Sequence, residues 1–290
     1  MSSKPNEPVA RDEVTVPWIR ARKRREGAEP LVMVTAYDEP WSRLVDAAGV
    51  DLVLVGDTLA EVVLGRESTL GVTVSEMAHH VAAVARARPR ALVVGDMPWM
   101  SYHTDPFAAA ENAAELIRAG AAAVKLEGGR RRLGAVRAIL DAEIPVMGHL
   151  GLTPQSRHSM GGYRVQGRGV AQAVELLADA KALAEAGCFA LVLEGVPDVL
   201  ATKVTSEVDV PTIGIGAGPD CDGQVLVLHD LIGMSDGAAP KFVRRYAQLG
   251  DAVVDAVARY AADVRSGSFP AAAETYHGST ELKELLAPDS

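Results

Sequence analysis

The chain has 290 residues, of which 48% are hydrophobic and 23% charged, and its formal net charge is −9. This composition is typical of a soluble globular protein with enough apolar material for one large core, in one domain or two. The acidic balance argues against nucleic acid or an anionic membrane as a partner and favours a small molecule.

Short β-branched runs alternate with Ala-rich amphipathic segments from Leu31 onward, which is the pattern of repeated βα units. Eight such runs begin at Leu31, Asp51, Ala91, Ala122, Ile144, Phe189, Val210 and, with the weakest pattern, Gln224. Eight strands in strict alternation with helices predict an α/β fold, a (β/α)8 TIM barrel, which typically needs ~250 residues. A doubly wound open sheet is the alternative, and only the eighth strand separates the two folds.

Local signals mark the ends of several predicted helices. Thr73 with Glu76 forms a capping box, and Asp105 followed by Pro106 is typical of a helix start. Glycines follow three helical runs as C-terminal stops, namely Gly49, Gly120 and Gly187. A last helix is expected to begin at Lys241 and to run to about Arg265, with an apolar stripe for core or subunit contact.

The expected organisation is a single barrel domain over residues 18–270, with a flexible N-terminal arm at 1–17 and a flexible tail at 271–290. Two connections, residues 58–72 and 150–169, are too long for simple turns and are predicted to be functional loops. Residues 1–13 lack the apolar core of a signal peptide, and no apolar stretch could span a bilayer. Cys188 and Cys221 lack CxxC spacing and are too few for a disulfide framework, so we expect a cytoplasmic protein that contacts no membrane.

Polar residues stand at the ends of the predicted strands: Asp57, Asp96, Lys125, Glu127, His149 and Glu194. In a parallel barrel these ends open onto one face, so the side chains are expected to converge. Lys125 and Glu127 lie two apart and therefore point the same way. Carboxylates ~4 Å apart repel by about 4 kcal/mol at an effective dielectric of ~20, so a cation is expected between them. A carboxylate ligand set favours Mg²⁺.

Simpler interpretations exist for single residues. Asp57 or Asp96 taken alone is a turn or helix-cap residue, and His149 alone fits a satisfied polar residue as well as a substrate contact. The GIGAG stretch at 214–218 lacks dinucleotide-site spacing and indicates only close backbone approach. His229 and Asp230 are assigned to helix initiation. A role in helix capping does not explain why Lys125, Glu127 and Glu194 also stand at strand ends. Taken together, these residues favour a single functional site.

Longer motifs carry a family resemblance. They are VTAYD at Val34, LVGD at Leu54, GDMP at Gly95, VKLEGG at Val124 and IGIGAG at Ile213, and most specifically GHLGLTPQS at Gly148 and GGYRVQGR at Gly161. By these motifs the chain resembles the ketopantoate hydroxymethyltransferase (3-methyl-2-oxobutanoate hydroxymethyltransferase) family from about Val34 to Phe269. The resemblance implies a phosphoenolpyruvate/pyruvate-type barrel, usually a homodecamer.

The resemblance also implies a reaction. A hydroxymethyl group moves from 5,10-methylenetetrahydrofolate to 3-methyl-2-oxobutanoate (α-ketoisovalerate), giving 2-dehydropantoate for pantothenate and coenzyme A biosynthesis through a Mg-stabilised enolate. By their positions in the family motifs, Asp57, Asp96 and Glu127 correspond to the acids that bind the metal, and Glu194 corresponds to the proton acceptor. The substrate contacts by the same resemblance are Asp57, Thr58, Asp96, Lys125 and His149.

The chain departs from the family pattern in one loop. The usual GDSLG reads GDTLA here, so Thr58 replaces a serine and Ala60 a glycine, and Gly71 stands where a proline is usual. Thr58 keeps the hydroxyl group of the usual serine, although the loop is more crowded near the substrate. Three alternatives are a Mg-dependent keto-acid lyase or mutase of the same barrel group, a hydroxymethyltransferase for another 2-oxo acid, and a keto-acid-binding paralogue without turnover.

Overall fold

Eight parallel strands close into a barrel in the computed structural model, which describes residues 12–23, 29–162, 164–235, 237 and 239–287. Each strand is short and nearly all of its residues are buried. In chain order the strands are β1 Leu31–Thr35, β2 Leu52–Val55, β3 Leu92–Asp96, β4 Ala123–Glu127, β5 Val146–Gly151, β6 Ala190–Glu194, β7 Thr212–Ile215 and β8 Gly223–Leu226.

The weakly patterned eighth strand is present and closes the barrel. β8 pairs in parallel with β7 and also with β1, where Leu31 lies opposite Gly223. An open sheet would leave β1 or β8 with a free edge. The predicted (β/α)8 barrel is therefore confirmed, and the doubly wound alternative is wrong.

Alternation along the strands divides the core into two layers. Alternate residues such as Leu52, Leu54 and Met147 form one buried cluster, which fills the inside of the barrel. The residues between them, for example Val53 and Leu126, belong to a second cluster that packs against the helices. Because side chains alternate with period two, the inward set continues to the strand ends and decides which polar residues face the mouth.

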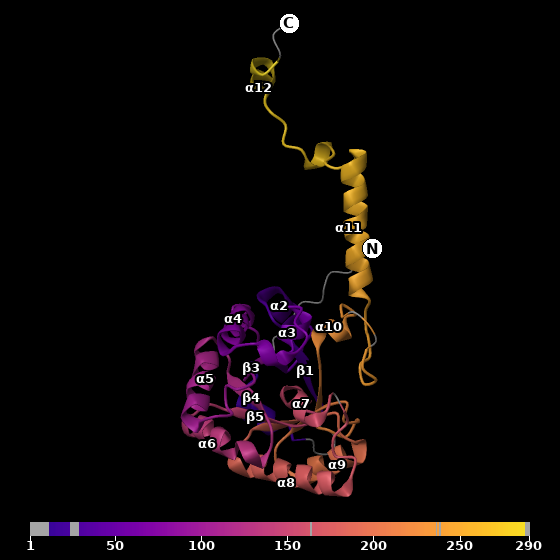
Figure 1. The fold of residues 1–290 in the computed structure, drawn as a ribbon. Coiled ribbons are helices and arrows are strands. Elements are labelled where there is room, and N and C mark those ends of the chain that lie inside the picture. Colours follow the sequence, from indigo (N-terminus) through magenta and orange to yellow (C-terminus); the bar gives the residue numbers. More distant parts are fainter. Residues whose placement is uncertain (1–11, 24–28, 163, 236, 238, 288–290) are drawn as a thin grey trace.

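In the part of the chain that the structure describes, six helices of nine or more residues follow the strands and pack around the barrel, as Figure 1 illustrates. Their starts follow the sequence signals: Thr73 and Glu76 form both bonds of a capping box, and the Asp105 side chain accepts a hydrogen bond from Ala108 N. Gly49, Gly120 and Gly187 have positive φ and end helical runs, as predicted. The six are α2 Glu39–Ala47, α4 Val74–Ala85, α5 Pro106–Arg118, α6 Leu133–Asp141, α8 Val170–Ala186 and α9 Asp198–Glu207.

The expected strict alternation of strands and helices fails at one connection. β7 leads to β8 through residues 216–222, all of them described, without a helix. Seven residues that include Gly216, Gly218 and Pro219 are too few and too poor in helix formers for one. Val32, on the outer side of β1 next to β8, is 47% exposed.

The two long connections carry short helical turns. Residues 58–72 contain α3 Leu59–Val62 and η1 Thr69–Gly71, and residues 150–169 contain η3 Pro154–Ser156 and α7 Arg157–Met160. Arg157 Nη1 donates to the Glu67 carbonyl at 3.1 Å, which joins the two loops. A third turn, η2 Arg130–Arg132, follows β4.

The N-terminal segment closes the opposite end of the barrel. Helix α1 Val16–Arg20 places Ile19, which is fully buried, in the inner cluster, and Val14 N donates to the Arg90 carbonyl at 2.8 Å. Of the arm predicted at 1–17, residues 1–11 lie outside the described residues. Val14 and Val16, which lie near the end of the predicted arm, pack against the inner cluster of the barrel.

The C-terminal part of the chain leaves the barrel. After α10 Leu228–Leu231, helix α11 Leu249–Ser266 projects away from the barrel, and η4 Ala272–Glu274 and α12 Thr280–Leu285 extend further (Figure 1). Of the predicted tail, residues 288–290 lie outside the described residues.

The expected helix start at Lys241 is wrong. Residues 241–248 are not helical, because their backbone hydrogen bonds go to other segments: Tyr246 N donates to the Leu231 carbonyl at 2.8 Å and Leu249 N to the Ile232 carbonyl at 2.9 Å.

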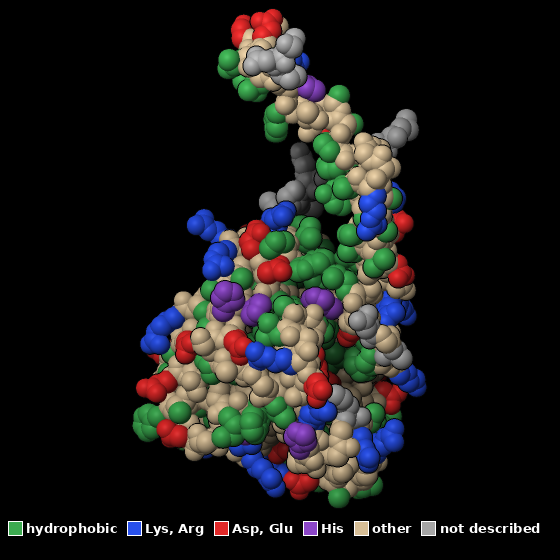
Figure 2. All heavy atoms as spheres, turned by 45° about the horizontal axis from the view of Figure 1, so that its top comes forward, with side chains coloured by type: hydrophobic (Ala, Val, Ile, Leu, Met, Phe, Trp, Pro, Cys, Tyr) green, Lys and Arg blue, Asp and Glu red, His purple; other side chains and the backbone are tan. Residues whose placement is uncertain are grey.

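Hydrophobic side chains run along the projecting segment (Figure 2). Within the described residues, no helix is both long and apolar enough to cross a bilayer.

Candidate active site at the mouth of the barrel

The inward positions at the strand ends carry most of the predicted site. Asp96, Lys125, Glu127, His149 and Glu194 belong to the ends of β3 to β6. Asp57 follows β2 directly, and all six predicted strand-end residues line one cavity of about 50 Å³ together with apolar side chains such as Leu54 and Val192. The structure therefore brings together residues that lie up to 137 positions apart, counting from Asp57 to Glu194.

A lysine lies among the carboxylates. Lys125 Nζ is 2.8 Å from Asp96 Oδ1, and both side chains are almost completely buried. Burial alone would lower the pKa of Lys125, but the charges of Asp96, Glu127 and Asp57 outweigh it, so the pKa is raised and the ammonium stays charged. The cation that the sequence requires among these acids is thus supplied in part by the chain itself.

Negative charge remains in excess at the mouth. Burial raises the pKa of Asp57 well above its usual range, and the neighbouring charges of Asp96 and Glu127 raise it further. Lys125 and a protonated His149 supply two positive charges against the four carboxyl groups in this cavity, which are Asp57, Asp96, Glu127 and Glu194. A further cation at this place would stabilise the ionised form of Asp57.

His149 lies between two carboxylates. Its Nδ1 is 3.4 Å from Glu127 Oε1, and its Nε2 is 3.3 Å from Glu194 Oε2. Burial and the charge of Lys125 lower the pKa of His149, but hydrogen bonds to Glu127 and Glu194 raise it to about 9 overall. Each ring nitrogen of the protonated imidazole thus faces one carboxylate at ion-pair distance, and Lys125 Nζ also lies 3.3 Å from Nδ1. The ion pair with Glu194 helps to orient that carboxylate in the cavity.

Sequence reasoning assigned no role to Gln155, which connects two of the acids that were predicted to bind metal. Gln155 Nε2 donates to Asp57 Oδ2 at 2.9 Å, and its backbone N donates to Glu127 Oε2 at 3.1 Å. The hydroxyl of Tyr102 donates to Gln155 Oε1 at 2.5 Å and accepts from Glu127 N at 3.2 Å. Gln155 lies in the GHLGLTPQS motif, which was the available signal, whereas Tyr102 belongs to no quoted motif.

Thr58 also lines the cavity, and its hydroxyl lies 2.7 Å from the hydroxyl of Tyr37. Tyr37 is part of the VTAYD motif and was not assigned a role from the sequence. Burial raises the pKa of Tyr37, so its hydroxyl remains protonated and can act as the donor to Thr58. The added methyl of Thr58 therefore leaves its hydroxyl oriented by a buried partner.

The donor chemistry of the mouth fits a hard cation. Asp57, Asp96 and Glu127 offer only carboxylate oxygens, and the nearest donor to the buried Oε1 of Glu127 is His149 Nδ1 at 3.4 Å, which is too long and poorly aligned for a good hydrogen bond. Within the described part of the chain, no three Asp, Glu, His or Cys side chains are arranged so that they could hold one metal ion together. Mg²⁺ commonly binds through one or two carboxylates and keeps its other positions for water and substrate, so a site with few protein ligands suits it.

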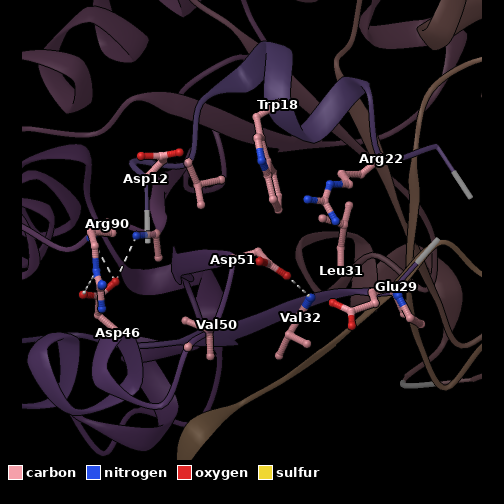
Figure 3. Close-up of a pocket in the computed structure, with 14 residues that line it drawn as sticks. Asp12, Trp18, Arg22, Glu29, Leu31, Val32, Asp46, Val50, Asp51 and Arg90 are labelled. Carbon is pink, nitrogen blue, oxygen red and sulfur yellow. Dashed lines mark hydrogen bonds and ion pairs between the residues drawn. The ribbon is translucent and has the colours of Figure 1, made fainter. Parts of the chain in front are cut away.

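A separate cavity of about 430 Å³ lies at the opposite end of the barrel, beside α1 (Figure 3). Two of its acids already have backbone partners: Asp51 accepts from Val32 N at 2.8 Å, and Asp46 accepts from the backbone of Arg90 and Ala91. These bonds tie the strand starts together. The opposite end of a TIM barrel is where such structural contacts are expected, so the mouth remains the candidate active site.

The profile of one protein family, ketopantoate hydroxymethyltransferase, matches residues 13–272. The chain belongs to this family. Among its curated relatives are the 3-methyl-2-oxobutanoate hydroxymethyltransferases of Ignicoccus hospitalis and Moorella thermoacetica, each 58% identical. The first alignment covers 86% of this chain and 94% of the relative, and the second covers 90% and 96%. Family membership identifies the chain as an enzyme of the hydroxymethyltransferase kind.

Solved structures of other enzymes share the fold. A phosphoenolpyruvate phosphomutase from Streptomyces platensis subsp. rosaceus is 17% identical with a TM-score of 0.58, over 93% of this chain and 94% of that one. A 2,3-dimethylmalate lyase, described as a member of the PEP mutase/isocitrate lyase superfamily, is 18% identical with a TM-score of 0.57, over 87% and 85%. At this identity the likeness concerns the barrel alone and agrees with the predicted phosphoenolpyruvate/pyruvate type.

Proposed function

We propose that the chain transfers a hydroxymethyl group from 5,10-methylenetetrahydrofolate to 3-methyl-2-oxobutanoate, giving 2-dehydropantoate for pantothenate and coenzyme A biosynthesis. The observation that carries the proposal is the meeting of Glu194, Lys125 and the three acids in one cavity. The names of the relatives at 58% identity support the same reaction. The remote likeness to a lyase and a mutase concerns the fold and gives those rival functions no further support.

Glu194 is proposed to be the general base. Its side chain is 17% exposed and has His149 Nε2 at 3.3 Å, while the apolar Val192 and Ile215 line the same cavity. A carboxylate in such surroundings can take the proton from C3 of the keto acid, next to the carbonyl. His149 is proposed to orient Glu194 and to contact the substrate.

Lys125 and Thr58 are proposed to bind the anionic substrate. Lys125 is buried and charged, so it can offset the substrate carboxylate at the bottom of the cavity. The hydroxyl of Thr58, which Tyr37 orients at 2.7 Å, can donate to a substrate oxygen. Both groups fix the keto acid with its branched carbon toward Glu194.

Asp57, Asp96 and Glu127 are proposed to hold Mg²⁺, with the first two also near the substrate. When bound, Mg²⁺ would supply electrophilic stabilisation of the keto acid's oxygens. The role of the chain is to keep these carboxylates ionised and oriented. Gln155 does so by donating to Asp57 and Glu127.

The proposed reaction balances with one water. Glu194 takes the C3 proton, and C3 forms a bond to the methylene carbon of the folate. Both bonds from that carbon to nitrogen break, and water supplies the hydroxyl oxygen. The two nitrogens of the departing tetrahydrofolate take up two protons, namely the one that Glu194 removed from C3 and one from the water. The apolar lining of the cavity, including Leu54 and Val225, limits the access of other water to the carbanion.

We also propose that the chain forms a homo-oligomer, a decamer by resemblance to the family, in the cytoplasm. Helix α11 supports assembly because Val253, Val257, Tyr260 and Val264 lie on one face and are 46–59% exposed. Burial of this face against a second copy would remove it from water. Cys188 and Cys221 are free and buried, as expected in a reducing compartment.

Turnover with 3-methyl-2-oxobutanoate and 5,10-methylenetetrahydrofolate tests the proposed function directly. The protein with Mg²⁺ should form 2-dehydropantoate faster than the products of other 2-oxo acids, including the straight-chain 2-oxopentanoate. Preference for another 2-oxo acid would point to the altered loop around Thr58 and Ala60. Carbon–carbon cleavage without folate would replace the proposal with a lyase.

A further inference from the structure

A large side cavity opens beside the candidate active site. It measures about 810 Å³, and it shares five lining residues with the central cavity: Thr58, Pro154, Glu194, Ile215 and Val227. The central cavity, at about 50 Å³, leaves no room for a second and larger reactant. The side cavity falls within the range that binds whole ligands.

We propose that this side cavity binds the pteridine ring of the folate donor, an assignment that rests on the proposed function. Glu194 lines both cavities, so a donor in the side cavity meets the keto acid at the carbon from which Glu194 takes its proton. The new carbon–carbon bond forms at that carbon. A donor site must therefore adjoin Glu194, and this cavity does.

Phe242 provides an aromatic wall. Its side chain is 39% exposed and packs against Gly216, where an added Cβ would lie 2.9 Å from the ring. Gly216 also has φ of +61°, so two constraints favour glycine here. The GIGAG stretch thus lets Phe242 approach the end of β7, and the open face of the ring is free to stack on a fused heterocycle.

Asp230 provides a matching polar group. Its carboxylate is half-buried at the cavity wall, and among the described residues it has no hydrogen-bond or ion-pair partner. The pyrimidine edge of a pterin presents two adjacent N–H donors, which a carboxylate accepts in parallel as it accepts a guanidinium. Asp230 is therefore expected to orient the ring within the cavity.

The cavity is lined by charged groups of both signs, and Glu61 and Asp198 belong to it in addition to Asp230 and Glu194. Arg164 and Lys241 line it and are exposed. The glutamate end of a folate is a dicarboxylate, which would lie toward these cations while the ring lies toward Phe242. The lining thus offers an aromatic wall and an acid for the ring, and cations for the glutamate end.

A second large cavity, of about 750 Å³, is the competing site. It is lined by Arg130, Arg131 and Arg132, but it shares only Glu127 with the central cavity. Glu127 is not the proposed base, so a donor there would face the acids and not the carbon that reacts. Arg130 is also paired with Glu175 and Asp179.

Calorimetric titration of the full-length protein with tetrahydrofolate, under reducing conditions, tests the assignment without turnover. Phe242→Ala and Asp230→Asn should each raise the Kd for tetrahydrofolate at least tenfold. The matched control is Phe107→Ala, because Phe107 is 82% exposed on α5 and lines none of these cavities. The Kd of the Phe107→Ala variant for tetrahydrofolate should stay at the wild-type value. Circular dichroism and thermal midpoints check that each variant is folded.

Two results separate this assignment from the proposed function. Wild-type Kd values in both Phe242→Ala and Asp230→Asn, or a loss that occurs in Arg131→Ala instead, would overturn the side cavity as the donor site and leave the reaction intact. A wild-type protein that neither binds tetrahydrofolate nor uses the methylene donor would overturn the proposed function itself, and the assignment with it.

Discussion

Gln155 and Asp57, 98 residues apart in the chain, meet in the barrel mouth, where Gln155 Nε2 donates to Asp57 Oδ2 at 2.9 Å. The backbone of the same glutamine holds Glu127 at 3.1 Å. One residue of the long β5–α8 connection thus fixes two carboxylates from different strands. Loss of such a supporting partner typically costs a metal site 10- to 100-fold in affinity or activity.

Gln155→Met removes the side-chain donor at similar volume. We expect turnover to fall roughly 10- to 100-fold and the Mg²⁺ concentration for half-maximal rate to rise. Steady-state kinetics over a Mg²⁺ series measures both. The control Gln172→Met changes an exposed glutamine on α8 and should behave like wild type. Equal Mg²⁺ requirements in the two variants would contradict a role for Gln155 at the metal.

Lys125→Met removes the buried cation beside Asp96. The carboxylates that remain are then uncompensated, and breaking a buried ion pair in this way typically costs about 3–5 kcal/mol of unfolding free energy. Urea denaturation without metal should show the loss, and added Mg²⁺ should restore part of it. The control Lys283→Met lies on exposed α12 and should change little. An unchanged midpoint in Lys125→Met would mean that the acids are protonated in the folded protein.

Acid should remove the contribution of Glu76 to stability. Hydrogen bonds, first from Arg66 and then from Thr73, lower the pKa of Glu76 from 4.5 to about 2. A lowered folded-state pKa stabilises the fold fully above about pH 4.5, and this stability is lost as the pH falls toward 2. Because the pair is partly solvated, we expect Glu76→Gln to cost less than about 1 kcal/mol at pH 7.

The difference between wild type and Glu76→Gln is the quantity to follow. Thermal midpoints at pH 7, 5, 4 and 3 should show a constant difference down to about pH 5 and a smaller one below. A difference that grows in acid would have the wrong sign for a carboxyl whose pKa is lowered. The comparison cancels the acid titration of all other groups.

The apolar face of α11 should control assembly. Val257→Glu places a charge in the middle of the face formed by Val253, Tyr260 and Val264, and burial of an unpaired charge would oppose association. Light scattering after gel filtration should show a smaller particle than wild type. Ala262→Glu, on the opposite side of the helix, should leave the mass unchanged. A monomeric wild-type protein would contradict the proposed oligomer.

The barrel and the inward acids could be predicted because both depend on local periodicity. Alternation of side chains places Lys125 and Glu127 on one face and Leu126 on the other, and the structure has this arrangement. The direct β7–β8 connection and the true start of α11 at Leu249 were missed. Both depend on tertiary contacts, such as the bond from Tyr246 N to Leu231, that no local propensity encodes.

The supporting residues of the site were missed for a related reason. Gln155 and Tyr37 lie in motifs that carry the family resemblance, but a motif names residues without saying which atoms meet. Tyr102 reaches Gln155 and Glu127 from the loop after β3, and its position depends on how three loops pack. The roles of Asp57, Asp96, Glu127 and Glu194 in metal binding and proton transfer stay predictions.

Glu194 is proposed to take a proton from the keto acid in the barrel mouth. The most direct test is exchange of the C3 hydrogen of 3-methyl-2-oxobutanoate for deuterium in D₂O, followed by NMR with Mg²⁺ and without folate. Wild-type protein should exchange it, and Glu194→Gln should not, although it still binds the keto acid by calorimetry. Exchange at the wild-type rate in Glu194→Gln would contradict the account.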